Sequence, residues 1–290
     1  MAEAVEFEVP GATLRGRLFR PAGTGDPVPL IVMSPGLTQV IDMSLDAFAE
    51  NFAEAGLAAL LYDQRNFGLS GGEPRQEADP WAQVHDMRDA VSFARRLPGV
   101  DAERIGLWGT SYSGGHALVV GALDQRVKCV VAQAPLISGY GTLQSWLAPD
   151  ELDALIADCL ADRDARDAGA APVMTPVAQP GSVEATWVAA TDPTDAFVNG
   201  LTMRSRELIF EYEPESFVAR IAPTPLLMIV ASQDVVTPVD GQRAAFVGAG
   251  EPKRLVEIEC GHFDVYSSHF DAAANAAREW FCTHLTGARP

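Results

Sequence analysis

The sequence predicts an α/β fold, with a mostly parallel central sheet and helices on both of its faces. First, short apolar runs of strand length alternate with amphipathic helical patterns near both ends of the 290-residue chain. Second, these runs are continuously apolar, as expected of parallel strands that are buried on both faces. Third, roughly eighty residues interrupt the alternation, which is too long for an ordinary connection between strands. Strands that are joined through helices form right-handed crossovers, so successive strands lie parallel.

The elements of the first half follow one another in a regular order. Two strands flank the turn Pro10-Gly11 as a hairpin, and apolar runs and helical patterns then alternate. The predicted strands are Ala4–Val9, Thr13–Phe19, Leu30–Met33, Ala58–Tyr62, Arg104–Trp108 and Val127–Gln133. The predicted helices are Ser44–Ala55, with Ser44 as its N-terminal cap, Trp81–Leu97 and Ser113–Leu123.

The alternation stops near Gly139 and returns after Arg220. The segment between them holds helix-prone stretches such as Glu151–Asp167 and a proline-containing loop, Gly169–Val183, and no buried strand is expected there. We therefore expect residues 139–220 to form a helical cap over the carboxyl ends of the strands, where ligands bind in open α/β sheets. Residues 1–138 and 221–290 are expected to form the core. Its last elements are predicted at Pro225–Ala231, Val239–Val247, Arg254–Ile258 and Ala272–Leu285.

The composition restricts the kinds of partner. The chain has 39 acidic and 21 basic residues, a formal net charge of -18, which repels nucleic acid and anionic membrane surfaces. No apolar run approaches the roughly 18 residues of a membrane span, and no signal peptide is expected. Four cysteines lie far apart without a C-x-x-C pair, as in a cytoplasmic protein. The histidines lack metal-ligand spacing, so no metal or cofactor is expected; a homodimer is left open.

The strongest chemical signal is the segment Gly109–Gly115, which lies directly between a predicted strand and a predicted helix. A nucleophile on such a tight turn needs small residues two positions before and after it, and Gly109 and Ser113 satisfy this around Ser111. The turn projects the Ser111 hydroxyl out of the sheet, next to the positive end of the following helix. Ser113 also has small neighbours, but it would begin deeper in the helix. Ser111 is therefore the expected nucleophile.

A serine nucleophile needs a histidine base that is oriented by a carboxylate. Asp234 follows the predicted strand Pro225–Ala231, and His262 follows the predicted strand Arg254–Ile258. Both therefore lie at the same sheet edge as Ser111, and we expect the three side chains to converge. Asp264 and His269 are nearby competitors in less suitable positions.

Acyl transfer also needs two donors for the oxyanion. The backbone N–H of Tyr112, which follows the expected nucleophile, is one candidate. The loop Ser34-Pro35-Gly36-Leu37 follows an early strand at the same sheet edge. Its Leu37 N–H is the second candidate.

Together these residues resemble the α/β-hydrolase superfamily over nearly the whole chain. Tyr62–Gly72 is similar to the D-x-R-G-x-G-x-S loop of that superfamily, with Asn66 in place of the first glycine. The tyrosine after the elbow serine and the S-G-G ending of this loop resemble the Xaa-Pro dipeptidyl-peptidase and cocaine-esterase branch, although its carboxyl-terminal β-domain is not expected here. Gly261–Tyr266 looks more like small bacterial hydrolases and fungal polyketide acyltransferases or thioesterases. Two departures from the superfamily pattern remain. Ser34-Pro35 replaces the usual histidine before the oxyanion-loop glycine, and Ser113 replaces the second glycine of the elbow.

The resemblance implies a capped serine hydrolase that cleaves an ester or thioester of a partly apolar, small-molecule acyl substrate. An acyltransferase that passes the acyl group to an alcohol or amine, a carbon–carbon bond hydrolase and a non-catalytic ligand-binding module are the alternatives. A serine nucleophile argues against haloalkane dehalogenases and epoxide hydrolases, which carry aspartate there. Apolar cap residues that could line the substrate pocket, or pack between cap helices, are Trp146, Leu147, Trp187, Phe197, Ile209, Phe210 and Tyr212.

Overall fold

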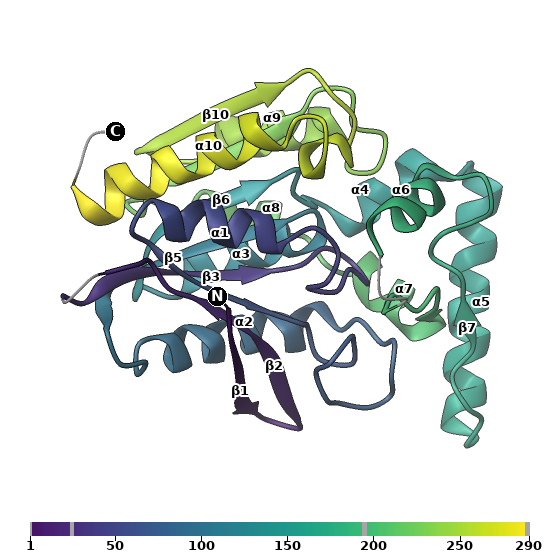
Figure 1. Ribbon diagram of the computed structural model, residues 1–290. Coiled ribbons are helices and arrows are strands. Elements are labelled where there is room, and N and C mark those ends of the chain that lie inside the picture. The colour runs from purple at the N-terminus through teal and green to yellow at the C-terminus, as the bar shows by residue number, and fades with distance from the viewer. Residues whose placement is uncertain (1, 24–25, 193–195, 288–290) are drawn as a thin grey trace.

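The computed structural model describes residues 2–23, 26–192 and 196–287. In this part of the chain, eight strands form one sheet in the order β1-β2-β4-β3-β5-β6-β9-β10 (Figure 1). The first two strands form an antiparallel hairpin, and the six strands from β4 to β10 lie parallel, as predicted. The strands are β1 (Glu3–Val9), β2 (Ala12–Phe19), β3 (Val28–Ser34), β4 (Ala58–Tyr62), β5 (Val100–Thr110), β6 (Val127–Gln133), β9 (Leu226–Ala231) and β10 (Lys253–Ile258).

Helices cover both faces of this sheet (Figure 1). On one face lie α1 (Asp46–Glu54) and α10 (Phe270–Phe281), which continues into a short π-helix. The other face is covered by α2 (Pro80–Ala94), α3 (Tyr112–Leu123), α8 (Glu215–Val218) and α9 (Val239–Gly248). Among the described helices, none is both long and apolar enough to cross a membrane.

Strand β3 shows why the sheet carries two hydrophobic cores. All seven of its residues are buried. Successive side chains of a strand point to opposite faces, so Leu30 and Val32 pack into the core under α2 and α3, whereas Ile31 and Met33 pack into the core under α1 and α10. A continuous apolar run is therefore required at the centre of the sheet, which is what made this strand predictable.

The start of α1 differs from the prediction. Ser44 has a φ of 63°, in the left-handed region, and does not cap the helix. Leu45 occupies the N-cap position without a side-chain hydrogen bond, and the helix begins at Asp46. Helix α2 instead has a polar cap, because the Asp79 carboxylate accepts hydrogen bonds from two backbone N–H groups of the first turn.

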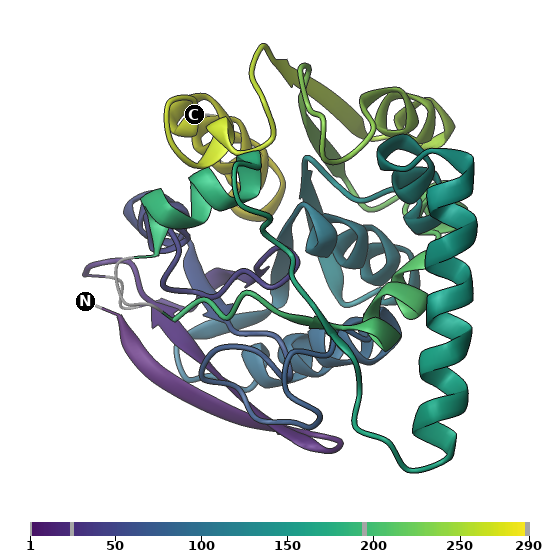
Figure 2. The same cartoon turned by 90° about the vertical axis from the view of Figure 1, so that its right-hand side faces the viewer.

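The segment after β6 lies over the carboxyl-terminal edge of the sheet (Figures 1 and 2). The prediction that this segment holds no buried strand is wrong in one detail: two short strands, β7 and β8, pair antiparallel, and both residues of β8 are buried. Strands of two residues carry no periodicity by which a sequence could reveal them. The elements are α4 (Gly139–Trp146), α5 (Pro149–Asp167), β7 (Met174–Thr175), α6 (Val183–Thr191), β8 (Leu201–Thr202) and α7 (Met203–Phe210).

Helix α8 packs mainly with the helices that cover the sheet, rather than with the cap. It lies within the predicted insertion at residues 139–220, but it packs against α3 and α9, and Val218 is part of the core under these helices. We therefore propose a cap that spans residues 139–210, with the described residues on either side of it as the core.

Candidate active site

Ser111 occupies the sharp turn between β5 and α3. Its φ of 54° and ψ of -121° place it in a conformation that is strained for a residue with a side chain. Backbone hydrogen bonds hold the turn on both sides. The Ser111 N–H donates to the Gln133 backbone carbonyl (2.8 Å), and the Leu136 N–H donates to the Ser111 carbonyl (2.8 Å). A Cβ on Gly109 would lie 2.1 Å from the backbone oxygen of Ser113. Glycine is therefore required two residues before Ser111, as the sequence indicated.

Ser113, the other serine of this segment, has a different environment. It is fully buried, its hydroxyl accepts a hydrogen bond from the Thr110 N–H (3.0 Å), and it donates to the Ser34 carbonyl (2.6 Å). These bonds join the elbow to the end of β3. The serine that replaces the second elbow glycine therefore stabilises the turn and does not face the cavity.

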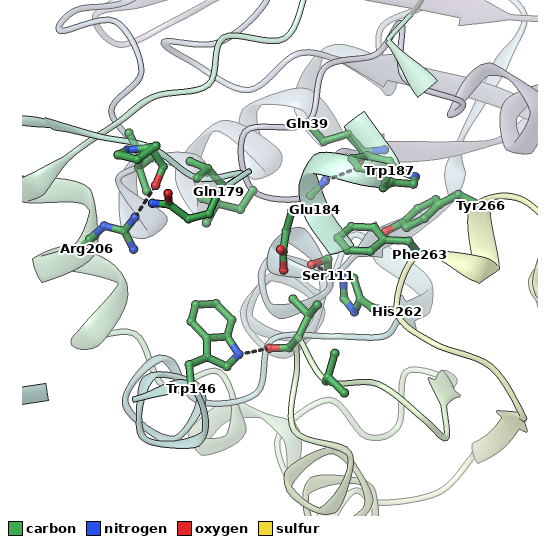
Figure 3. Close-up of a pocket in the computed structure, with 17 residues that line it drawn as sticks. Gln39, Ser111, Trp146, Gln179, Glu184, Trp187, Arg206, His262, Phe263 and Tyr266 are labelled. Carbon is green, nitrogen blue, oxygen red and sulfur yellow. Dashed lines mark hydrogen bonds between the residues drawn. The ribbon is translucent and has the colours of Figure 1, made fainter. Parts of the chain in front are cut away.

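The structure brings Ser111, His262 and Asp234 together, and Figure 3 shows the first two at the base of the cavity. His262 Nε2 lies 3.0 Å from Ser111 Oγ, and His262 Nδ1 lies 2.6 Å from Asp234 Oδ2. Asp234 follows β9 and His262 follows β10, so the parallel strands deliver both side chains to the edge where α3 begins. The convergence predicted from the sequence is present in the geometry.

Asp234 is held as an ionised acceptor. Its Oδ1 accepts hydrogen bonds from the N–H groups of Val236 (2.7 Å) and Thr237 (2.9 Å), and its Oδ2 accepts one from the Thr237 hydroxyl (2.7 Å). Burial acts to raise the pKa of this carboxyl, but His262 and the hydrogen bonds outweigh burial and bring the pKa below its ordinary value. Thr237 was missed in the sequence, although a threonine three residues after an aspartate is a common loop-stabilising pattern.

The loop after β3 lies beside the nucleophile. A Cβ on Gly36 would lie 3.4 Å from Ser111 Cβ, and the Gly36 N–H is held by Gln39 Oε1 (2.8 Å). Leu37 lines the same cavity as Ser111. Within the described residues, neither the Leu37 N–H nor the Tyr112 N–H donates to a protein acceptor. Their role as oxyanion donors is compatible with this geometry and stays a prediction.

The competitors identified in the sequence serve other purposes. Asp264 Oδ2 accepts a hydrogen bond from the Gly261 N–H (2.8 Å), which shapes the loop that carries His262. His269 lies at the N-cap of α10, which begins two residues before the predicted start of this helix. With Cys260 these two residues place possible ligand atoms within 4.8 Å of one another. However, burial raises the pKa of the Cys260 thiol to about 11, which disfavours the thiolate that a metal ion requires.

A cavity opens above Ser111 between the core and the cap (Figure 3). Its outer part has a volume of about 350 Å³, and a narrower, apolar inner part has a volume of about 80 Å³. The outer part reaches Gln179, Glu184 and Trp187, whereas the inner part lies between α4 and the start of α3. Residues that line both parts are Leu37, Ser111, Trp146, Leu201, Arg206 and Val236.

Two of the five aromatic residues that the sequence offered for the pocket line it. Trp146 donates its indole N–H to the Val236 carbonyl (2.9 Å), and Trp187 stacks on Phe263 with ring centroids 4.9 Å apart. The prediction for Tyr212 is wrong. Its side chain is fully buried beneath the elbow and shares a hydrogen bond of 2.9 Å with His116 Nδ1, because aromatic residues that carry a hydroxyl also suit a buried polar contact.

Of the other four apolar candidates, one lines the cavity and three do not. Ile209 lines the inner part of the cavity. Three of the candidates are not among the lining residues: Leu147, Phe197 and Phe210. Sequence reasoning did not single out the polar lining residues Glu184 and Arg206, since isolated charged residues on cap helices resemble an ordinary solvated surface.

Comparison with known proteins supports the architecture. The sequence profile of the X-Pro dipeptidyl-peptidase (S15) family matches residues 10–263. A thiohydrolase of Eupenicillium brefeldianum is 34% identical over 279 residues, which cover 91% of this chain and 88% of that protein. A polyketide transferase of a Penicillium species, GrgF, is 31% identical, with 97% of this chain and 96% of that protein covered.

Solved structures agree with this relationship. The structure of DcsB in complex with its substrate analogue matches with a TM-score of 0.88 and 27% identity, covering 99% of this chain and 100% of that chain. The crystal structure of the α/β hydrolase GrgF from Penicillium sp. sh18 matches with a TM-score of 0.86 and 30% identity, covering 99% of both chains. The chain therefore belongs to the X-Pro dipeptidyl-peptidase (S15) family and is an enzyme of the α/β-hydrolase superfamily.

Proposed function

We propose that this enzyme is a serine hydrolase that cleaves a carboxylic ester or thioester through an acyl-enzyme on Ser111. The observation that carries the proposal is the unbroken path of hydrogen bonds from Ser111 Oγ through His262 to Asp234, at the base of a largely apolar cavity. The names of the relatives, thiohydrolase and polyketide transferase, fit an enzyme that cleaves a thioester or transfers its acyl part. Fold alone does not select this reaction, because the superfamily hosts many chemistries.

The first half of the reaction forms the acyl-enzyme. Ser111 Oγ attacks the acyl carbon as its proton passes to His262 Nε2, and the Leu37 and Tyr112 N–H groups donate to the developing oxyanion. His262 then gives the proton to the departing alcohol or thiol. Asp234 holds the imidazole by Nδ1 and stabilises its charged form, which is consistent with the lowered pKa of this carboxyl.

The second half releases the acid. A water molecule attacks the acyl carbon, His262 takes its proton and then returns a proton to Ser111 Oγ as the acyl–oxygen bond breaks. The cap excludes bulk solvent from this centre and sets the acyl preference through residues such as Trp146 and Trp187.

Acyl transfer is the second candidate, because the Penicillium relative is named a polyketide transferase. In that case an alcohol or amine replaces water in the second half of the reaction. The outer part of the cavity, at about 350 Å³, offers space for such an acceptor beside the acyl group.

A graded substrate series tests the proposal. We expect turnover of p-nitrophenyl esters and of N-acetylcysteamine thioesters, with an optimum at medium chain length, and labelling of Ser111 by an active-site fluorophosphonate. Primary alcohols added to the reaction distinguish the two candidates. Free acid as the main product with every acceptor supports the hydrolase, whereas transfer product at low alcohol concentration supports the transferase. Absence of Ser111 labelling and of turnover with all substrates would refute both.

A further inference from the structure

Arg206 is a cation in the substrate cavity for which the described part of the chain provides no carboxylate partner. It projects from α7, is half-buried, and lines both the outer and the inner part of the cavity. Within the described residues, no carboxylate oxygen lies within ion-pairing distance of its guanidinium. A charge in an apolar site is costly unless it is paired, so this arginine is suited to an anion that arrives with the substrate.

The other arginines of the cap show the contrast. Arg163 and Arg166 pair with Glu207, and Arg204 pairs with Glu77. Glu207, which follows Arg206 in the chain, and Glu77 are therefore already engaged in ion pairs with other arginines. Acidic residues outnumber basic ones in this chain by 39 to 21, so a cavity arginine that no described carboxylate pairs with is unexpected.

The guanidinium is fixed in orientation. Its Nε donates to Thr175 Oγ1 (2.9 Å), and one terminal nitrogen, Nη2, donates to the Pro176 carbonyl (3.0 Å). Thr175 in turn donates to the Leu201 carbonyl (3.1 Å), so Arg206 is anchored to the β7–β8 pair. In the described part of the chain, the other terminal nitrogen, Nη1, has no hydrogen-bond partner. A held guanidinium with open donors recognises a carboxylate at a low entropic cost.

Two charged side chains of the cavity, Glu184 and Arg206, determine at which side an anion can bind. Glu184, from α6, also lines the cavity and is directed toward the side of Ser111 and His262, whereas Arg206 lies across the cavity (Figure 3). A negative charge near Ser111 would face Glu184. An anion is therefore favoured at the Arg206 side, away from the reacting bond, in a cavity that is also lined by apolar side chains such as Leu37 and Val236.

We propose that Arg206 binds a carboxylate at the distal end of the acyl group, so that the preferred substrates are half-esters or half-thioesters of dicarboxylic acids. This inference rests on the proposed ester or thioester cleavage at Ser111. It assigns the substrate a negatively charged end and an apolar middle, and it makes Arg206 a specificity-determining residue rather than only a link between α7 and β7.

The test compares matched substrates that differ only in charge. Mono-p-nitrophenyl esters of glutarate, adipate and suberate are assayed against the same compounds with the free carboxylate as its methyl ester. We expect the wild type to prefer the free carboxylate at one or more chain lengths. Arg206→Met should lower the ratio of kcat/KM between the two forms about 10- to 100-fold, mainly through KM, as expected for a hydrogen-bonded charge. Arg206→Lys should retain part of the preference.

Arg163→Met, which removes an exposed cap arginine paired with Glu207, is the matched control and should leave the ratio unchanged. A wild type without preference at any length, or an Arg206→Met variant with an unchanged ratio, would overturn the proposal. The anion could also be the phosphate of a phosphopantetheine leaving group. Thioesters of the same uncharged acyl group on phosphopantetheine and on N-acetylcysteamine are therefore compared. An Arg206→Met effect confined to the phosphopantetheine thioester would overturn the carboxylate assignment. If neutral esters are turned over throughout, the proposed function stands even where this inference fails.

Discussion

The hydrolase core and the cap fix their side chains to very different extents. Ten of the twelve residues of α3, which follows Ser111, are buried, whereas no residue of α6, which carries Glu184 and Trp187, is buried. Asp234 receives hydrogen bonds at both carboxylate oxygens, yet Glu184 has no hydrogen-bond or ion-pair partner in the described part of the chain. The core therefore preorganises the chemistry, and the cap can change its lining without disturbing it. The comparison predicts large effects on rate for core substitutions and effects on selectivity for cap substitutions.

The largest effect is expected at Ser111. Ser111→Ala removes the nucleophile and should lower kcat by about a millionfold, measured by steady-state release of p-nitrophenol. The fold should remain, because alanine is small enough for the elbow. The matched control is Ser113→Ala, which removes two buried hydrogen bonds and should cost about 1–3 kcal/mol of stability. That variant should still be labelled at Ser111 by a fluorophosphonate. Labelling at Ser113 in the wild type would exclude our assignment.

The next effect concerns the carboxylate that orients the base. Asp234→Asn should lower kcat roughly 10⁴-fold, because the amide favours the wrong tautomer of His262. The lowered pKa of Asp234 keeps the wild-type carboxylate ionised from neutral to mildly acidic pH. Asp264→Asn, in the loop that carries His262, is the control and should lower kcat less than about tenfold, since within the described residues the Asp264 carboxylate bonds only to the Gly261 N–H. Near-normal activity of Asp234→Asn would remove this residue from the mechanism.

The same contrast explains what the sequence could predict. Central strands such as β3 and β9 are almost entirely apolar and fully buried, so the sequence predicts them clearly, and residues at their carboxyl ends must share one sheet edge. The placement of Ser111, Asp234 and His262 follows from that rule. The cap has no such constraint. The β7–β8 pair is too short for a periodic pattern. The sequence also cannot show that Glu207 and Glu77 form ion pairs with arginines other than the half-buried Arg206.

Selectivity should change more than rate when the cap is altered. Trp187 stacks on Phe263, next to His262, and closes one side of the outer cavity. Trp187→Ala should enlarge the cavity and shift the optimal acyl length by two or more carbons, with about a tenfold change in kcat/KM for the longest esters and less than threefold for acetate. A chain-length series of p-nitrophenyl esters measures this. An equal loss at every length would show that α6 contributes to the chemistry itself.

The smallest effect on activity is expected at Tyr212, although its position in the sequence suggests the cap. Its hydroxyl bonds to His116, whose Nε2 is already without a partner in the described part of the chain, and burial lowers the pKa of His116 to about 3, so its ring is neutral. Tyr212→Phe would leave both ring nitrogens unpaired and should cost about 1–2 kcal/mol. Thermal unfolding should then show a Tm lower by roughly 2–8 °C, with kcat/KM within twofold at every acyl length.

Tyr140→Phe, at an exposed cap tyrosine, is the control and should change neither quantity. A changed acyl preference in Tyr212→Phe would place this residue with the cap cavity and break the division between the two regions.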